Sequence, residues 1–419
     1  MAAAHRQRAG GAANLLHGLS LQRSLEARFA RLIAGDGDDA QALPGCTWAV
    51  FARGRAIEAG AVGFADPIAQ RPLRADTPMR VASISKIATA LVVLQLADSG
   101  RLSLDADLSD ALGFALRNPA HPDAPITARQ LLSHTSSMRD GEVYWAGLGE
   151  RMADFFTPGA AYWEDGGHWS ADAPGARFAY CNLGFGVLAT LVERVENTRF
   201  DLVARERLIG PLGLSGGFNW SGASEATVAR GAPVWRRIDG AWAGQVDDPL
   251  PIGRTPTFLN PSALDLSSYT LGDNGALFSP QGGLRASVLD LVRLGWLLMG
   301  PAAPFLTPET LAAMRTPHWR LAGDNGDSED GYWRAYGLGL QVLEPGDGSS
   351  IEGQTAALIG HPGDAYGLRG GLWLDPTRAR GFAFLFNGGP DDPVRAPGVR
   401  SAFLRSEEQA MQALYEAMA

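Results

Sequence analysis

The chain contains a single lysine, Lys86, and all its other strongly basic side chains are arginines. A guanidinium stays protonated in proteins, whereas an amine can lose its proton when it is buried. Lys86 lies in a run over residues 84–96 that is apolar on nearly every helical face, which predicts a helix buried between layers of structure. Because a buried amine costs free energy unless it is neutral or hydrogen-bonded, the sequence indicates chemistry at Lys86 rather than a surface charge.

A serine, Ser83, precedes Lys86 by three positions. On a helix this spacing places both side chains on one face, about 5–6 Å apart at their Cβ atoms. The amine can then accept the hydroxyl proton and activate the serine without a histidine. Serine and lysine meet at this spacing by chance in many helices, but the lone lysine and its apolar helix favour the functional interpretation.

Two more short motifs lie downstream. Tyr180 and Asn182 stand two positions apart, immediately before an apolar helical stretch, and a turn there can aim both side chains into one cleft. The alternative makes Asn182 a helix cap and Tyr180 a packed aromatic residue. His361 and Gly363 fall on a predicted strand, where a glycine allows a ligand to approach the backbone closely. Alone, this third motif is a strand end with a turn.

Strand patterns occur near both ends of the chain and helical patterns lie between them. This order predicts an α+β fold with one antiparallel sheet built from both chain ends and flanked by helices. We expect residues 1–100 and 271–419 to form this sheet domain. Residues 101–270 form a mainly helical inserted domain in this prediction, and the active site lies between the two.

The ordered set Ser-x-x-Lys, Tyr-x-Asn and His-x-Gly resembles the penicillin-recognising serine hydrolases. These comprise class C β-lactamases, D-alanyl-D-alanine carboxypeptidases, D-aminopeptidases and family VIII carboxylesterases. The resemblance covers nearly everything from about residue 45 to 390 and implies a β-lactamase/transpeptidase-like fold. It also implies that Ser83 is the acylated nucleophile and Lys86 its base, that Tyr180 shuttles a proton to the leaving group, and that Asn182 holds the acyl side of the substrate.

The same resemblance places the third motif opposite the nucleophile. His361 and Gly363 match the strand motif, and the backbone N–H of Asp364 would form an oxyanion hole with that of Ser83. Many β-lactamases carry Lys-Thr-Gly here, so the histidine and proline of this chain lack the cation and the hydroxyl that engage a substrate carboxylate. Arg369 is a candidate for the missing positive charge. We also expect the apolar pocket to bring the pKa values of Lys86 and Tyr180 within reach of neutral pH.

These motifs predict a serine hydrolase that works through an acyl-enzyme. A carboxylesterase for short-chain esters is the first interpretation, because the groups that anchor a carboxylate are weakened. A D-amino-acid peptidase or weak β-lactamase is the second. A binding or sensing module that is acylated without turnover is the alternative from another class. The partner in each case is a small-molecule ester, amide or lactam, and neither a cofactor nor a metal is implied.

Charge and hydropathy argue against two classes of partner, nucleic acids and membranes. The formal charge of −9 and pI near 5.3 provide no basic field for nucleic acid, and no stretch reaches the eighteen or so apolar residues of a membrane span. Asn14 and His17 interrupt the only early stretch that resembles a secretory core. We expect a cytoplasmic protein, or a periplasmic one if a leader has been removed. The sequence leaves the oligomeric state open.

We interpret a second serine motif, the two cysteines and the remaining histidines as structural. Ser215 fits a Gly-x-Ser-x-Gly pattern, but that nucleophile elbow needs a strand before it and a helix after it, which the surrounding sequence lacks. Cys46 and Cys181 lie far apart and are interpreted as separate, reduced and buried thiols. The other histidines lie in turn-like or polar loops without metal-ligand spacing, and they include His121, His134, His168 and His318.

Overall fold

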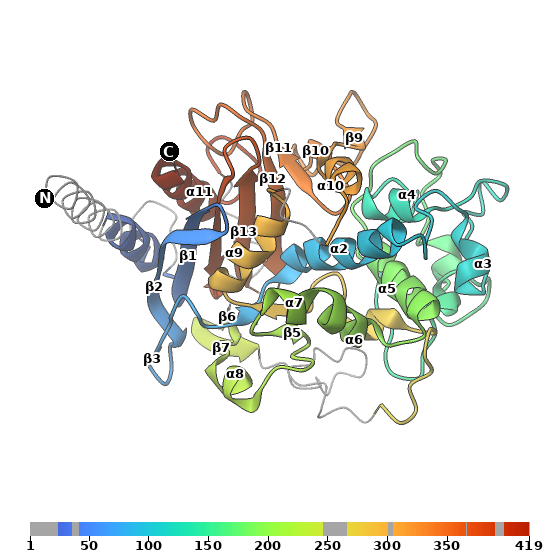
Figure 1. Cartoon of the computed structure of the whole chain (residues 1–419), viewed down its shortest axis with the longest axis horizontal. Coiled ribbons are helices and arrows are strands. Elements are labelled where there is room, and N and C mark those ends of the chain that lie inside the picture. Colours follow the sequence, from blue (N-terminus) through green and yellow to red (C-terminus); the bar gives the residue numbers. More distant parts are fainter. Residues whose placement is uncertain are drawn as a thin grey trace, which may run out of the picture.

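The computed structural model describes residues 24–35, 42–245, 266–300, 305–365, 367–389 and 398–418. Its centre is a nine-stranded antiparallel sheet in the order β3-β2-β1-β14-β13-β12-β11-β10-β9 (Figure 1). The prediction of one antiparallel sheet built from both chain ends is confirmed. The strands are β1 (Gly45–Ala52), β2 (Arg55–Asp66), β3 (Arg71–Pro72), β9 (Trp319–Arg320), β10 (Ala335–Tyr336), β11 (Gln341–Leu343), β12 (Leu358–Ala365), β13 (Leu368–Asp375) and β14 (Arg380–Phe386).

Alternation of side chains along the strands gives this sheet two apolar faces. In β1, Trp48 and Val50 pack into one hydrophobic cluster, and Ala49 and Phe51, which alternate with them, pack into another. The helix over residues 24–34 and α11 (Arg405–Met418) cover the first face. The helices α2 (Ser85–Asp98) and α9 (Val288–Leu297) pack on the second (Figure 1). The sheet is therefore the middle layer between two helical layers.

The central helix α2 is the buried helix that the sequence predicts. Eleven of its fourteen residues are buried, Lys86 among them, so the helix has no solvent-facing stripe. It ends at Asp98, and Gly100 follows in the left-handed conformation (φ 70°) that glycine adopts readily. Its first turn lies beside β12, which brings the Ser-x-x-Lys and His-x-Gly motifs together.

Residues 101–245 and 266–270 contain most of the remaining helices and also three strands. Two of these strands pair with strands outside this range: β5 (Gly217–Phe218) with β8 (Leu284–Ala286), and β6 (Val234–Ile238) with β15 (Gly388–Gly389). The third, β7 (Ala241–Gln245), pairs with β6, and β4 (Met79–Arg80) pairs with the other side of β8. We keep the division into a sheet domain and an inserted helical domain as a proposal. The other helical elements are α3 (Leu108–Leu112), α4 (Ala128–Leu132), η2 (Met152–Phe155), η3 (Glu164–Gly166), α5 (Leu183–Glu196), α6 (Phe200–Ala204), η4 (Arg205–Ile209), α7 (Gly210–Leu212), α8 (Glu225–Arg230), η6 (Gly275–Phe278) and α10 (Pro308–Arg315).

Candidate active site

The candidate nucleophile lies at the junction of two helical turns. Ser83 is in a short 3₁₀ turn, η1 (Ala82–Ile84), which runs directly into α2. Ala82 adopts a left-handed conformation (φ 48°), which is uncommon for a residue with a side chain and sets the direction of the turn. Ser83 keeps part of its surface exposed while its neighbours are buried. Lys86 is fully buried, and its Nζ lies 3.1 Å from Ser83 Oγ.

The contacts of Lys86 determine what its amine can do. Burial lowers the pKa of Lys86 to about 7, although Asp140 and Cys181 oppose this shift. Its Nζ lies 2.7 Å from Asn182 Oδ1 and 3.1 Å from the backbone oxygen of Gln281. Both oxygens can only accept hydrogen bonds, so they occupy both N–H groups of a neutral amine. The lone pair is left for the Ser83 hydroxyl, which gives the amine the geometry of a general base.

Asn182 does not act as a helix cap. It occupies the position before α5, but its side chain makes no capping hydrogen bond. Its Nδ2 donates to Asp140 Oδ2 at 2.7 Å, which fixes the amide so that Oδ1 faces Lys86. The backbone N–H of Leu183 donates to Asp140 Oδ1 at 2.9 Å, so Asp140 caps α5 in its place. Asp140 is a site residue that the sequence analysis missed, because nothing in its local pattern relates it to a helix forty positions away.

The ring of Tyr180 lies beside Lys86, whose Nζ is 4.7 Å from the ring centre. The ring stacks on Trp333 with 4.5 Å between ring centres. Its hydroxyl is buried and makes no hydrogen bond of regular geometry within the described residues. Burial raises the pKa of Tyr180 well above its usual value, and the nearby Ser83 hydroxyl offsets this only in part. The expectation of a near-neutral pKa is therefore met by Lys86 and is wrong for Tyr180, which stays protonated.

His361 lies on β12, as predicted, and it is fully buried. Its Nδ1 lies 2.7 Å from the carbonyl oxygen of Pro362, which can only accept, so Nδ1 carries the proton. Its Nε2 then accepts from the Tyr336 hydroxyl at 2.9 Å. Burial, with a further contribution from Lys86, lowers the pKa of His361 to about 3. This histidine is neutral, and both its nitrogens already have partners.

The rest of the third motif packs against the nucleophile turn. A side-chain carbon built on Gly363 would lie 2.7 Å from the Val81 carbonyl oxygen, so only glycine allows β12 to lie this close to η1. Pro362 lies beyond the last residue of β12 that pairs with β11, Gly360, and no ladder bond is lost there. Arg369 faces Asp364 across the β12–β13 ladder and forms an ion pair with it, so part of its charge is compensated.

These groups surround one cavity of about 370 Å³. Six of the eight predicted site residues line it, whereas Lys86 and Gly363 lie behind that lining. With Arg369 and Asp364 included, the lining carries three arginines and three carboxylates, and its other walls include aromatic and apolar side chains. The predicted lining residues are Ser83, Tyr180, Asn182, His361, Asp364 and Arg369; further lining residues include Arg80, Tyr144, Trp145, Arg236, Leu277, Glu329, Tyr332, Trp333, Leu404 and Glu407.

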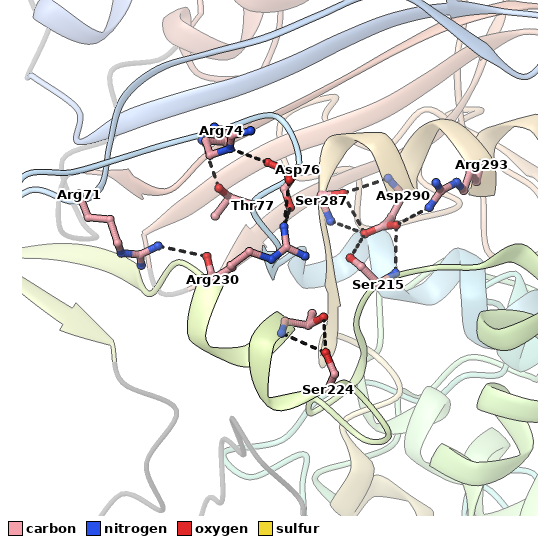
Figure 2. Close-up of polar contacts among 11 residues, drawn as sticks. Arg71, Arg74, Asp76, Thr77, Ser215, Ser224, Arg230, Ser287, Asp290 and Arg293 are labelled. Carbon is pink, nitrogen blue, oxygen red and sulfur yellow. Dashed lines mark hydrogen bonds and ion pairs between the residues drawn. The ribbon is translucent and has the colours of Figure 1, made fainter.

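Ser215 has a different environment. It lies between α7 and β5, and both its backbone N–H and its hydroxyl donate to the Asp290 carboxylate, at 3.1 and 2.6 Å (Figure 2). The same carboxylate accepts hydrogen bonds from Ser287 and pairs with Arg293 (Figure 2). These contacts fasten the start of α9 to the neighbouring loop. They give Ser215 a structural role and leave its hydroxyl as a donor to a carboxylate.

The two cysteines are free and buried, as predicted. Within the described ranges, His, Cys, Asp and Glu side chains do not form any group of three that could hold a metal ion. The helices of these ranges also include none that is long and apolar enough to cross a membrane.

The layered α+β fold, with Ser83 and Tyr180 on the wall of one cavity and Lys86 behind it, indicates the class of the protein, and comparison with known proteins agrees on the fold and the family. A family model described as beta-lactamase matches residues 29–404. The chain therefore belongs to the beta-lactamase family, a family of serine hydrolases, and the resemblance noted in the sequence is confirmed.

Individual relatives carry different activities in their names. Penicillin-binding protein 4 from Amycolatopsis lactamdurans is 31% identical over 176 residues, which span 41% of this chain but only 44% of that protein. Esterase EstB from Burkholderia gladioli is 30% identical over 291 residues, or 64% of this chain and 69% of the esterase. The structure of a class C beta lactamase from Rhodobacter sphaeroides has a TM-score of 0.65 at 17% identity and covers 94% of this chain and 99% of that chain, which confirms the fold.

Proposed function

We propose that this serine hydrolase acts through a covalent acyl-enzyme on Ser83 and is a carboxylesterase for short-chain esters. The observation that carries the mechanism is the 3.1 Å contact between the buried Lys86 Nζ and Ser83 Oγ. The side-chain carbonyl of Asn182 and the backbone carbonyl of Gln281 accept hydrogen bonds from the two N–H groups of this amine. A neutral amine with its lone pair on a serine hydroxyl is the arrangement that an activated serine requires.

In the proposed acylation step, Ser83 Oγ attacks the ester carbonyl carbon while its proton moves to Lys86 Nζ. The carbonyl oxygen becomes an oxyanion, which the backbone N–H groups of Ser83 and Asp364 stabilise. Such preorganised donors contribute about 3–4 kcal/mol each to lowering the barrier. The carbon–oxygen bond to the leaving alcohol then breaks, and this oxygen takes a proton from the Tyr180 hydroxyl. The Lys86 ammonium returns its proton to Tyr180.

Deacylation follows the same path in reverse. A water molecule attacks the acyl carbon and passes its proton through Tyr180 to the neutral Lys86, and Ser83 leaves with a proton from the lysine. Because the pKa of Tyr180 is raised by burial, the tyrosine is a protonated relay at rest. Lys86 takes up a proton and gives it back within each step, so it is neutral before and after both.

The preference for esters rests on the charges around the cavity. The third motif supplies no cation, because His361 is neutral and both its nitrogens have hydrogen-bond partners. It supplies no hydroxyl either, because Pro362 follows the histidine. Arg369 pairs with Asp364. With three arginines and three carboxylates on the lining, the formal charges sum to zero, so the cavity carries no net positive charge that would favour an anionic substrate. A neutral short-chain ester fits a cavity of about 370 Å³ with apolar and aromatic walls.

Steady-state rates on three substrates test this proposal: p-nitrophenyl butyrate, the cephalosporin nitrocefin and a D-alanyl dipeptide. We expect kcat/KM for the ester to exceed that for the other two by at least tenfold. Faster turnover of the dipeptide or of nitrocefin would replace the esterase by a D-amino-acid peptidase or a β-lactamase. A stable adduct on Ser83 without turnover of any substrate would instead favour a sensing module.

A further inference from the structure

A buried histidine without an assigned role holds the segment that carries Tyr180. His134 follows α4 and is buried, with a left-handed backbone conformation (φ 56°). Its backbone oxygen accepts a hydrogen bond from the Ala179 N–H at 2.9 Å. Its ring Nδ1 accepts one from the Cys181 N–H at 3.1 Å. The residues immediately before and after Tyr180 are thus both bound to His134.

The histidine ring also contacts the tyrosine itself. The centres of the His134 and Tyr180 rings are 4.5 Å apart, and Trp333 stacks on Tyr180 at the same separation. Tyr336 lies 4.9 Å from the His134 ring centre, and its hydroxyl binds His361. His134 therefore restrains the backbone on both sides of Tyr180 and also contacts its ring, and the aromatic cluster around His134 restrains the histidine in turn.

The chemistry of the ring indicates why a histidine stands here. Because Nδ1 accepts from Cys181, the proton of the neutral ring is on Nε2. This buried N–H has no hydrogen-bond acceptor among the described residues, which is unfavourable for folding. A phenylalanine would avoid that cost and fill similar space, but it would leave the Cys181 N–H without an acceptor. The feature that only the histidine supplies is the acceptor beside Tyr180.

We propose that His134 is a positioning residue for Tyr180, which fixes the tyrosine hydroxyl next to Ser83 and Lys86 through its hydrogen bond to Cys181. This inference rests on the proposed function, in which Tyr180 relays the proton. It concerns geometry alone, because burial lowers the pKa of His134 well below its usual value, with Lys86 and His361 adding to the shift. His134 therefore stays neutral and does not exchange protons with the substrate.

Three variants separate positioning from packing. His134→Phe keeps a ring and removes the acceptor, whereas His134→Asn keeps an acceptor close to the Nδ1 position and tolerates the left-handed backbone. His168→Phe is the control for replacing a buried imidazole by a phenyl ring, at a residue outside the left-handed region. His168 is also fully buried, has one unpartnered ring nitrogen, and binds the Tyr162 carbonyl oxygen at 2.9 Å, away from Tyr180.

The first readout is kcat on p-nitrophenyl butyrate per active site, with sites counted by phosphonate titration so that misfolded protein is excluded. A displacement of about 1 Å in a positioned group can cost on the order of a hundredfold in rate. We expect His134→Phe to lower kcat ten- to a hundredfold with little change in KM, His134→Asn to recover most of it, and His168→Phe to match the wild type. Equal kcat values for His134→Phe and the wild type would overturn the inference.

The second readout does not depend on catalysis. Hydrogen–deuterium exchange of a peptide covering residues 178–183 should accelerate in His134→Phe, less in His134→Asn, and not in His168→Phe. Unchanged protection in His134→Phe would contradict the inference even if the wild-type protein hydrolysed none of the substrates. A wild-type protein without turnover, together with faster exchange in His134→Phe alone, would overturn the proposed function and support the positioning of Tyr180.

Discussion

Asp140 Oδ2 accepts a 2.7 Å hydrogen bond from Asn182 Nδ2, and this contact turns the Asn182 carbonyl toward Lys86. The other oxygen of Asp140 caps α5. One carboxylate thus fixes both the direction of a helix and the orientation of an amide beside the nucleophile. The hydrogen-bonding pattern around Lys86 depends on that orientation, because a reversed amide would present N–H groups to the amine.

Asp140→Ala should therefore lower kcat/KM on p-nitrophenyl butyrate about ten- to a hundredfold, since Asn182 would be free to turn away from Lys86. Its stability should fall by about 1 kcal/mol from the lost cap. Asp107→Ala is the control, because Asp107 caps α3 through Ser109 at a distance from the cavity. We expect that control to lose stability while keeping its kcat/KM. Equal kcat/KM values for Asp140→Ala and the wild type would show that Asn182 needs no external restraint.

Lys86→Arg places a permanent positive charge at position 86 and cannot supply a neutral amine, because a guanidinium is not deprotonated in proteins. General-base catalysis contributes about 10²- to 10⁴-fold to rates. We expect kcat/KM to fall by a factor within that range, and by as much in Lys86→Met, which removes the amine and keeps the length of the side chain. An arginine variant with more than a tenth of wild-type activity would argue that charge, and not basicity, is what the site uses.

The pH dependence of the reaction follows from the buried amine. Lys86 is active when neutral, and burial lowers its pKa to about 7, so its active fraction grows as pH rises through 7. We expect kcat/KM to increase between pH 6 and 8 and to level off above that. Because Lys86 is the only lysine, incorporation of ¹³Cε-lysine gives one NMR signal whose titration reports its pKa directly. A midpoint close to 10.5 would contradict this interpretation.

A second buried acid predicts a pH effect on stability. Burial raises the pKa of Glu58 to about 7, although its carboxylate accepts hydrogen bonds from Trp48 Nε1. Because the pKa of Glu58 is higher in the folded than in the unfolded protein, the protonated carboxyl stabilises the folded state. This stabilisation is complete below about pH 4.5 and is lost as pH rises through 7. Glu58→Gln removes this dependence and retains an acceptor. Between pH 5 and 8, the free energy of unfolding of the wild type should fall relative to the variant by up to about 3 kcal/mol.

Chemical denaturation at both pH values measures that difference. A difference below about 0.5 kcal/mol would mean that the Glu58 carboxylate is hydrated in solution.

Local patterns were sufficient to predict the sheet, the central helix and the motif positions. The burial of α2 follows from the apolar residues on nearly all its faces, and the antiparallel sheet follows from the strand patterns near both chain ends. The contact between Ser83 and Lys86 follows from their spacing alone. In these cases the residues that interact are close in sequence, or their pairing is set by hydrophobic periodicity.

The parts that sequence reasoning missed depend on contacts between distant segments. Lys86 binds the Gln281 carbonyl 195 positions away, and Asp140 binds Asn182 42 positions away. Such partners leave no local signal, because any carbonyl or carboxylate of the chain could supply them. The same applies to the pKa of Tyr180, which the packing around its hydroxyl raises and the residue type alone does not reveal.

The central claim is that Ser83 is the nucleophile. Its most direct test is intact-mass analysis after incubation with a fluorophosphonate, followed by peptide mapping. We predict one adduct per chain, on the peptide that contains Ser83, absent in Ser83→Ala and unchanged in Ser215→Ala. An adduct that persists in Ser83→Ala, or one that disappears in Ser215→Ala, would contradict the account.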